Sequence, residues 1–252
     1  MITANSVLSQ VLGPLLNLPP VVTLLIISLV ITLIVTVIYK LMTDQKKMKE
    51  MKEQITDYQK KMKETKDTTK MLEIQKKAMD VNMKYMMQSM KPTLITFIPL
   101  IFIFAWLNTS MGYYPLLPNT EFNVTAYFNQ GVTGVALLNA TPELQITNME
   151  QKIENGKATW ILKGAEEGDY LLEISFNQET YKKDILITKE KSYKTPELLL
   201  KKSSAQKIVV GNVPVHPFGR FHLFSWYPGW LGTYIIFSIA LSFLLRKIMK
   251  VY

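Results

Sequence analysis

Cysteine is absent from this chain, and histidine occurs only twice, at His216 and His222. Without cysteine there is no disulfide framework, no thiolate metal site and no cysteine nucleophile. The HExxH, GxSxG, GxGxxG and Walker motifs are absent as well, so hydrolase, protease and nucleotide chemistry have no visible residues. The sequence therefore predicts a protein that is not an enzyme, with no catalytic residue, no metal ion and no cofactor.

Charged side chains are missing from three long stretches of the chain, which are residues 1–39, 92–120 and 221–245. Each contains an apolar run long enough to cross a bilayer. None of these runs carries the ionisable groups that proton relays, ion-coupled transport and voltage sensing need. The predicted fold class is an α-helical membrane protein with three transmembrane helices, at residues 21–39, 92–111 and 227–245. A secretory signal is the competing interpretation of the first run, but its basic start and cleavage site are missing.

The net charge of +9 is unevenly distributed along the chain. It is +6 over residues 40–91, zero over residues 108–226 and +3 over residues 246–252. Basic excess beside membrane ends is the positive-inside pattern rather than a nucleic-acid-binding face. We therefore expect a multi-pass plasma-membrane protein with its amino terminus outside, and with residues 40–91 and the carboxyl-terminal tail 246–252 in the cytosol.

Residues 40–91 have the spacing of a heptad repeat. The apolar positions of this seam are Met48, Met51, Ile55, Tyr58, Met62, Leu72, Met79, Met83, Met86 and Met90. The poor helix formers at residues 65–69 interrupt it, which predicts an antiparallel coiled-coil hairpin whose arms reach about 33 Å from the bilayer. Its lysines could approach ribosomal RNA phosphate; the ordinary alternative is that they are solvated and set the topology.

Prolines and aromatic residues mark the ends of the spans. Residues 1–20 contain several helix breakers, which exclude a long helix, and are expected to form an interfacial segment in which Val7, Leu8, Val11 and Leu12 could form a short turn. Pro92 is expected to begin the second span, and Pro99 to kink it. The aromatic residues expected at the outer membrane interface are Trp106, Tyr113, Tyr114, Trp226, Tyr227 and Trp230.

Residues 120–215 have the alternating pattern of an extracytoplasmic all-β domain. Asn155-Gly156 predicts a hairpin turn. The residues expected to face its core are Tyr170, Leu172, Ile174 and Phe176 on one strand and Tyr181, Ile185 and Ile187 on the next. The size fits an immunoglobulin-like sandwich, although tandem small sheets would give the same pattern. Of three sequons, at Asn108, Asn123 and Asn139, we take Asn123 and Asn139 as glycosylation candidates.

Hydroxyl side chains recur at helical spacing in all three spans. They are Ser28, Thr32, Thr36, Thr93, Thr96, Tyr234, Ser238 and Ser242. If they converge, they line a groove that lowers the cost of about 2.5 to 3.5 kcal/mol for a polar side chain at the bilayer centre. The alternative is that each hydroxyl bonds to its own helix or to a neighbouring one.

Methionine is concentrated at the membrane end of the second helix of the predicted hairpin. The cluster is Met79, Met83, Met86, Met87 and Met90. Flexible thioether side chains suit the binding of varied apolar segments, so we expect this surface to contact a nascent transmembrane helix. The alternative is a hairpin seam that uses methionine for its own packing.

The order of these segments resembles a known family. The second span opens K-P-x-L-I-T-F-I-P-L at residues 91–100 and ends F-A-W at 104–106, and the third opens P-G-W-L-G-x-Y at 228–234 and ends S-x-x-L-R-K at 242–247. Together with the hairpin, residues 1–115 and 225–252 resemble the archaeal YidC-like proteins of the Oxa/YidC/Alb insertase superfamily, whose relatives include the third subunit of the endoplasmic reticulum membrane protein complex.

The resemblance implies an insertase that assists nascent membrane proteins, beside the ribosome and with room for further membrane subunits, through a groove open to cytosol and lipid. Bacterial relatives carry an arginine in the groove, whereas no basic residue lies within the spans predicted here. Two alternatives stay open. One is a structural or receptor-type protein whose exterior domain binds a partner; the other, enzymatic, rests on His216 and His222.

Overall fold

The structure is a computed structural model that describes residues 4–219, 221 and 225–252. The chain divides into two compact units. Residues 1–105 and 231–252 form the helical unit, and residues 106–230 form the second unit, which contains the β domain. His222 lies outside the described residues.

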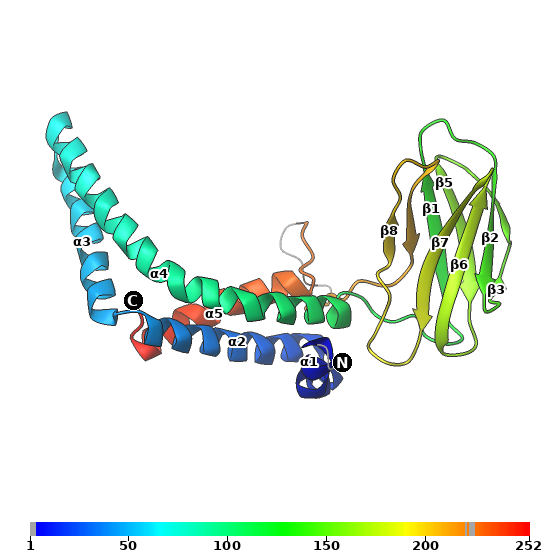
Figure 1. Cartoon of the computed structure of the whole chain (residues 1–252), viewed down its shortest axis with the longest axis horizontal. Helices are drawn as coiled ribbons and strands as arrows, with labels where there is room; N and C mark the ends of the chain where they lie inside the picture. The colour runs from blue at the N-terminus through cyan, green and yellow to red at the C-terminus, as the bar shows by residue number, and fades with distance from the viewer. Residues whose placement is uncertain (1–3, 220, 222–224) are drawn as a thin grey trace. The chain divides into compact units, whose positions relative to one another are not determined.

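The helical unit is built from long helices joined by short links (Figure 1). The helices are α1 Ala4–Leu12, the 3-10 helix η1 Gly13–Asn17, α2 Pro20–Met42, α3 Gln45–Glu64, α4 Thr68–Met111 and α5 Trp230–Met249. Within the described residues, α2, α4 and α5 are long and apolar enough to cross a membrane. The prediction of three membrane helices is confirmed.

Helix α2 shows how an almost uniformly apolar segment acquires two faces. Pro19 and Pro20 start it, and the Thr23 hydroxyl donates to the Leu15 carbonyl at 2.7 Å, which fastens η1 to its first turn. One face, at three- and four-residue spacing, is buried. It consists of Thr23, Leu24, Ile27, Ser28, Ile31, Thr32, Thr36 and Tyr39. The opposite face exposes Leu, Ile and Val side chains, as a bilayer requires.

Helix α4 runs without interruption through Pro92 and Pro99, so the expectation that Pro92 begins a helix was wrong. A proline inside a helix removes one backbone hydrogen bond. The hydroxyls of Thr93 and Thr96 donate to the carbonyls of Ser89 and Pro92, at 2.8 and 3.0 Å. Figure 1 shows α4 as one continuous, curved helix, and a proline inside a long helix is a usual cause of such bending.

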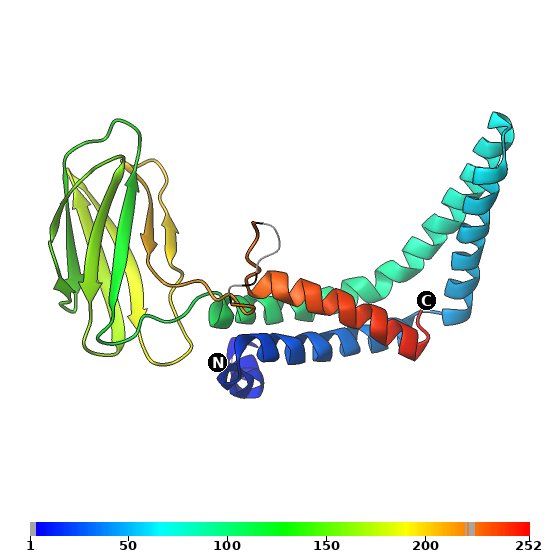
Figure 2. The same ribbon diagram turned by 180° about the vertical axis from the view of Figure 1, so that it is seen from behind.

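Helix α3 and residues 68–91 of α4, together called the arm, lie side by side at their shared tip and diverge away from it (Figures 1 and 2). Asp44 caps α3 by accepting from Lys46 N and Lys47 N, and Asp67 caps α4 by accepting from Thr69 N at 2.9 Å. The chain therefore reverses between Glu64 and Thr68, where poor helix formers were expected to turn it.

The expected heptad seam agrees with the structure on α3 and disagrees with it on α4. On α3 the seam is the least exposed face, with Met48 buried and the next seam positions half-buried. On α4 the expected positions are exposed, and the half-buried stripe is Ile74, Ala78, Val81, Tyr85 and Gln88. The seam predicted for α4 was therefore wrong. Both stripes of α4 have heptad spacing, and the sequence pattern favoured the more apolar one.

The β domain consists of two antiparallel sheets. In spatial order, one sheet contains β3 Gln145–Ile146, β5 Lys157–Lys163, β1 Glu121–Phe128, β9 Ala205–Val210 and β8 Glu197–Leu199. The other contains β4 Glu150–Lys152, β2 Val135–Thr141, β6 Gly168–Phe176 and β7 Glu179–Ile187. The two-sheet all-β region between the second and third membrane helices is confirmed.

The sheets share one hydrophobic core, which excludes tandem separate sheets within this region. Every side chain predicted to face the core from β6 and β7 is buried. Trp160 is fully buried and donates from Nε1 to the Met149 carbonyl at 2.9 Å. Lys183, which sequence reasoning missed, also points inward and is buried, with its Nζ donating to the Asp184 carbonyl at 2.7 Å.

Asn155 and Gly156 form the predicted turn, with φ of 52° and 73°. Positive φ at both central residues is the type I′ geometry that Asn-Gly favours. The strands on either side, β4 and β5, belong to different sheets, so the turn connects the two layers. Asn123 on β1 and Asn139 on β2 are exposed, and Asn108 lies in the last turns of α4.

Candidate functional site

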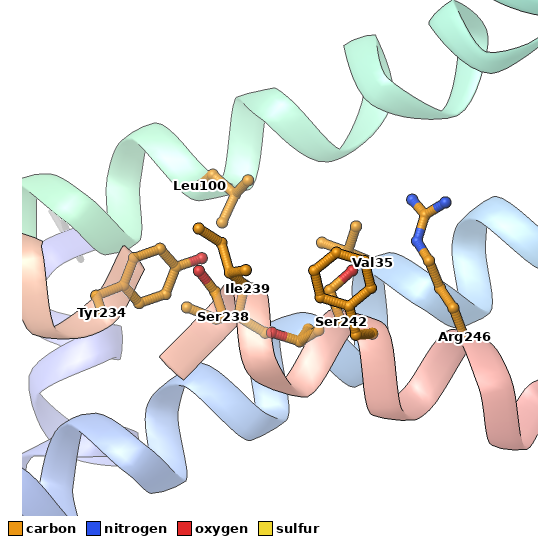
Figure 3. A pocket seen from close by; sticks show the side chains of 10 residues that line it. Val35, Leu100, Tyr234, Ser238, Ile239, Ser242 and Arg246 are labelled. Carbon is orange, nitrogen blue, oxygen red and sulfur yellow. The ribbon is translucent and has the colours of Figure 1, made fainter. Parts of the chain in front are cut away.

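A cavity of about 540 Å³ opens between the three membrane helices of the helical unit. It is lined by Ile31, Thr32 and Val35 of α2, by Leu100 of α4, and by Tyr234, Ser238, Ile239, Ser242, Phe243 and Arg246 of α5. Figure 3 shows Tyr234, Ser238 and Ser242 in order along α5, with Leu100 opposite them and Arg246 at one end. We call this cavity the groove.

Four of the eight hydroxyl residues named from the sequence line the groove: Thr32, Tyr234, Ser238 and Ser242. Residues 234, 238 and 242 share one face of α5 because they are four apart. The Tyr234 ring packs edge-on against Phe104 of α4, with centroids 4.9 Å apart. This contact orients the tyrosine.

The other four hydroxyl residues lie elsewhere. Ser28, Thr36 and Thr96 are buried, and Thr93 is exposed. Helix α4 therefore contributes an apolar side chain to the groove wall rather than a hydroxyl stripe. The groove is polar along α5 and at Thr32, and apolar elsewhere.

Several of these hydroxyls bond to their own helices, as the alternative interpretation expected. Thr32 donates to Ser28 O and Thr36 to Thr32 O, both at 2.6 Å, and Ser238 donates to Ile235 O at 3.1 Å. A hydroxyl that donates its hydrogen to a carbonyl of its own helix still has lone pairs that can accept a hydrogen bond. The groove can therefore still offer acceptors to a polar group that enters it.

Among the described residues of the helical unit, the buried hydroxyls of Ser28 and Thr233 lack a partner. The Oγ of Ser28 and the Oγ1 of Thr233 are shielded from solvent and accept or donate no hydrogen bond. Small hydroxyl residues let helices approach closely in a membrane. Their role here is packing of α2 and α5 rather than lining of the groove.

Arg246 supplies a positive charge that sequence reasoning did not place in the groove. It was excluded because the predicted span ended at residue 245, whereas α5 continues to Met249. Its Cζ lies 4.9 Å from the centroid of the Tyr39 ring of α2, a cation–π distance. The signal was present in the sequence, because residues 238, 242 and 246 continue one four-residue step.

Beside Arg246 the chain packs the joint between α2 and α3. Tyr39, Met48 and Val251 form a small buried cluster, with Tyr85 of α4 packed against it. The Tyr252 amide donates to Gln45 Oε1 at 2.9 Å. The residues that follow α5 therefore stabilise the joint between α2 and α3.

The five methionines Met79, Met83, Met86, Met87 and Met90 are between 49% and 63% exposed on α4. Their packing partner is therefore not α3, which contradicts the interpretation of this cluster as a hairpin seam. Together they leave an apolar surface beside the membrane end of the arm.

The lining of the groove offers a binding surface. The groove combines aliphatic walls, hydroxyl acceptors and one guanidinium, which suits an apolar segment that carries a few polar groups. Within the described residues, no cluster of three or more His, Cys, Asp or Glu side chains could hold a metal ion.

Comparison with known proteins matches the first half of the chain to a family. The family model described as "Integral membrane protein EMC3/TMCO1-like" matches residues 7–141, which is more than half of the chain. The matched range includes α2, α4 and the arm, and extends into the first strands of the β domain. No curated protein and no solved structure matches the chain.

Proposed function

Because this chain belongs to the EMC3/TMCO1-like family of integral membrane proteins, which is part of the Oxa/YidC/Alb insertase superfamily, we propose that it is a membrane protein insertase or membrane chaperone. It assists nascent transmembrane segments to enter the bilayer. The observation that carries the proposal is the groove, in which hydroxyls and Arg246 face a cavity bounded by membrane helices.

The physical role of the groove is to lower a barrier. A polar or charged side chain at the bilayer centre costs on the order of 2.5 to 3.5 kcal/mol on insertion scales. Hydroxyl acceptors and a guanidinium inside the membrane region replace part of the lost hydration. No bond is made or broken, so the protein acts without catalytic residues or a cofactor.

The proposed topology has the amino terminus outside and the carboxyl terminus in the cytosol of a plasma-membrane protein. The basic excess over residues 40–91 and 246–252 supports it. In this orientation the arm is a cytosolic coiled-coil hairpin, Arg246 lies at the cytosolic end of the groove, and the β domain is an exterior, immunoglobulin-like module. Among insertases, the segment order supports an archaeal YidC-like protein.

The exposed methionines of α4 are the proposed first contact for a client. Their flexible side chains adapt to apolar segments of different shape, and their exposure leaves them free to bind. A nascent helix would pass from this surface to the groove. The Lys-rich arm could meet ribosomal RNA on the same side, and further membrane subunits could cover the exposed faces of α2 and α5.

Filling the groove tests the proposal. Ser238→Phe with Ser242→Phe places two rings inside it, and Ala240→Phe with Leu244→Phe places the same rings on the exposed face of α5. In proteoliposomes, insertion of a single-span client, read by protease protection, should fall several-fold for the first pair and be unchanged for the second.

Equal insertion by both pairs would contradict the proposal and favour a receptor-type protein whose membrane helices are anchors. Ser238→Ala with Ser242→Ala covers the case in which the bulky groove variant fails to fold. It removes the hydroxyls without adding volume, and we expect it to slow clients with polar side chains more than fully apolar ones.

A further inference from the structure

The two segments that link the β domain to the membrane helices pair with each other. Tyr114 N donates to Val213 O at 2.8 Å, and Val215 N donates to Gly112 O at 3.0 Å. Tyr113 and Pro214 form an antiparallel bridge between them. We call residues 112–117 and 211–216 the base of the β domain.

The base is fastened to the sandwich above it. Thr188 N, just after β7, donates to Leu116 O at 2.9 Å, and Asn119 N donates to Gly164 O at 2.7 Å. Leu116 is buried in the core of the β domain. The base therefore moves with the sandwich rather than as a loose linker.

Tyr193, in the loop between β7 and β8, locks the same region to the end of α4. Its hydroxyl donates to the Asn108 carbonyl, and its ring lies edge-on to Tyr113 with centroids 5.4 Å apart. Gly112 makes room for it, because a Cβ there would clash with the tyrosine oxygen. The last turn of α4, the base and the sandwich form one connected structure.

The two strands of the base carry no Asp, Glu, Lys or Arg, and apolar side chains on and near them are exposed. Tyr114, Leu117, Val213, Trp226 and Tyr227 are between 45% and 61% exposed. Tyr114 and Val213 are cross-strand neighbours whose side chains share a face. No charged residue occurs at positions 92–120 or 208–219. A patch of this kind on a water-facing surface is unfavourable and marks an interaction site.

We propose that the base is a lipid-binding surface that lies in the headgroup region of the bilayer. The base continues directly into α4, which ends at Met111, and leads to α5, which begins at Trp230. Tyrosine and tryptophan favour the headgroup level because one end of each ring is apolar and the other is polar.

Backbone pairing makes this location physically acceptable. A segment in the membrane interface must satisfy its N–H and C=O groups within the protein or with headgroup water. The two strands of the base satisfy Tyr114 N and Val215 N, and the Asn212 side chain donates to Tyr114 O at 3.0 Å. The pairing leaves mainly apolar side chains to meet the lipid.

The absence of cysteine allows a direct test on the full-length protein. A single nitroxide-labelled cysteine is placed at Leu117 or Val213, with matched controls at Thr159 and Lys182 on the outer faces of the two sheets. The protein is reconstituted in vesicles of phosphatidylcholine and phosphatidylglycerol. Collision with membrane-soluble oxygen, relative to a water-soluble nickel complex, should be several-fold higher at the base positions than at the controls.

Two results would overturn the proposal. Base labels that collide with the nickel complex as often as the controls would place the base in water. Base labels shielded from both reagents would show a protein contact, such as a second copy of the chain. Neither result bears on client insertion, so failure here is distinguishable from failure of the proposed function.

Discussion

Arg246 is the residue that most changes the chemistry of the groove. It is the charged side chain among the residues that line the cavity, and it contacts the Tyr39 ring. Hydrogen bonds to charged groups contribute about 1.5 to 3 kcal/mol. A client that uses the guanidinium gains that energy only while its polar group passes through the membrane.

Replacing Arg246 by Gln should therefore slow insertion of clients with acidic or polar translocated segments by roughly tenfold, which corresponds to about 1.4 kcal/mol. Lys247→Gln is the matched control, because Lys247 is exposed on the same turn of α5 and does not line the groove. Protease protection in proteoliposomes measures both. An equal effect of the two substitutions would indicate a role in topology rather than in the groove.

Glu179 couples the two sheets of the β domain through hydrogen bonds. It accepts from the Tyr181 hydroxyl and from Ser204 N at 2.9 Å, and these bonds, that of Tyr181 first, hold the pKa of Glu179 below its ordinary value. A lowered folded-state pKa contributes stability above the unfolded pKa, and the contribution is lost as the pH falls through the folded pKa.

The stability lost in Glu179→Gln should thus be largest near neutral pH and should shrink below about pH 4.5, where the unfolded carboxyl begins to titrate. Thermal unfolding followed by near-ultraviolet circular dichroism measures it. Glu143→Gln, at an exposed carboxylate, is the control. A difference between wild type and Glu179→Gln that does not vary with pH would contradict this role.

Single residues also show where sequence reasoning succeeds. The inward positions of β6 and β7 followed from strict alternation, which depends only on strand geometry. Lys183 obeys the same alternation and is buried, yet it was passed over because lysines are usually exposed. Arg246 was missed for a related reason, since a count of apolar residues ends a helix at its first charge.

Helix α4 shows the limits of prediction for a whole element. Its helical nature follows from composition, but its unbroken length through Pro92 does not. Two of its faces have heptad spacing, and only tertiary packing makes the face with Ile74, Ala78, Val81 and Tyr85 the half-buried one. The expectation that Pro92 begins a helix failed for a different reason. Local rules treat proline as a boundary, whereas in a long helix with helix-favouring flanks it produces a bend.

The joint between α2 and α3 depends on the residues after α5. Val251 is buried against Tyr39 and Met48, and burial of a valine side chain contributes about 1.5 kcal/mol or more. This contact links α5, the helix that carries Arg246, to the joint between α2 and α3.

Val251→Ser should therefore loosen the joint between α2 and α3. We expect the ratio of molecules with this joint packed to molecules with it open to fall by roughly tenfold. Spin labels on cysteines introduced at Leu33 of α2 and Lys60 of α3 would report it as a broader distance distribution. Ile248→Ser, at an exposed position of α5, should leave the distribution unchanged. A distribution for Val251→Ser as narrow as that of the wild type would contradict this role of Val251.

At the scale of the whole molecule, the chain consists of a helical unit that contains the groove and a second unit built around the β domain. The order of the elements, the three spans and the presence of a β insertion could be predicted from charge-free runs and alternation. The groove's actual lining could not, because it depends on how α2, α4 and α5 rotate about their axes. That rotation turned Thr93 outward and brought Leu100 inward.

The central claim is that a client's transmembrane segment occupies the groove. Photo-crosslinking residues placed at Thr32 and Ser238 should react with a ribosome-tethered single-span client. The same residues at Leu29 and Ile236, on exposed faces of the same helices, and at Ile161 of the β domain should react weakly. Crosslinks from Ile161 alone, or equal crosslinks from groove and exposed positions, would contradict the account.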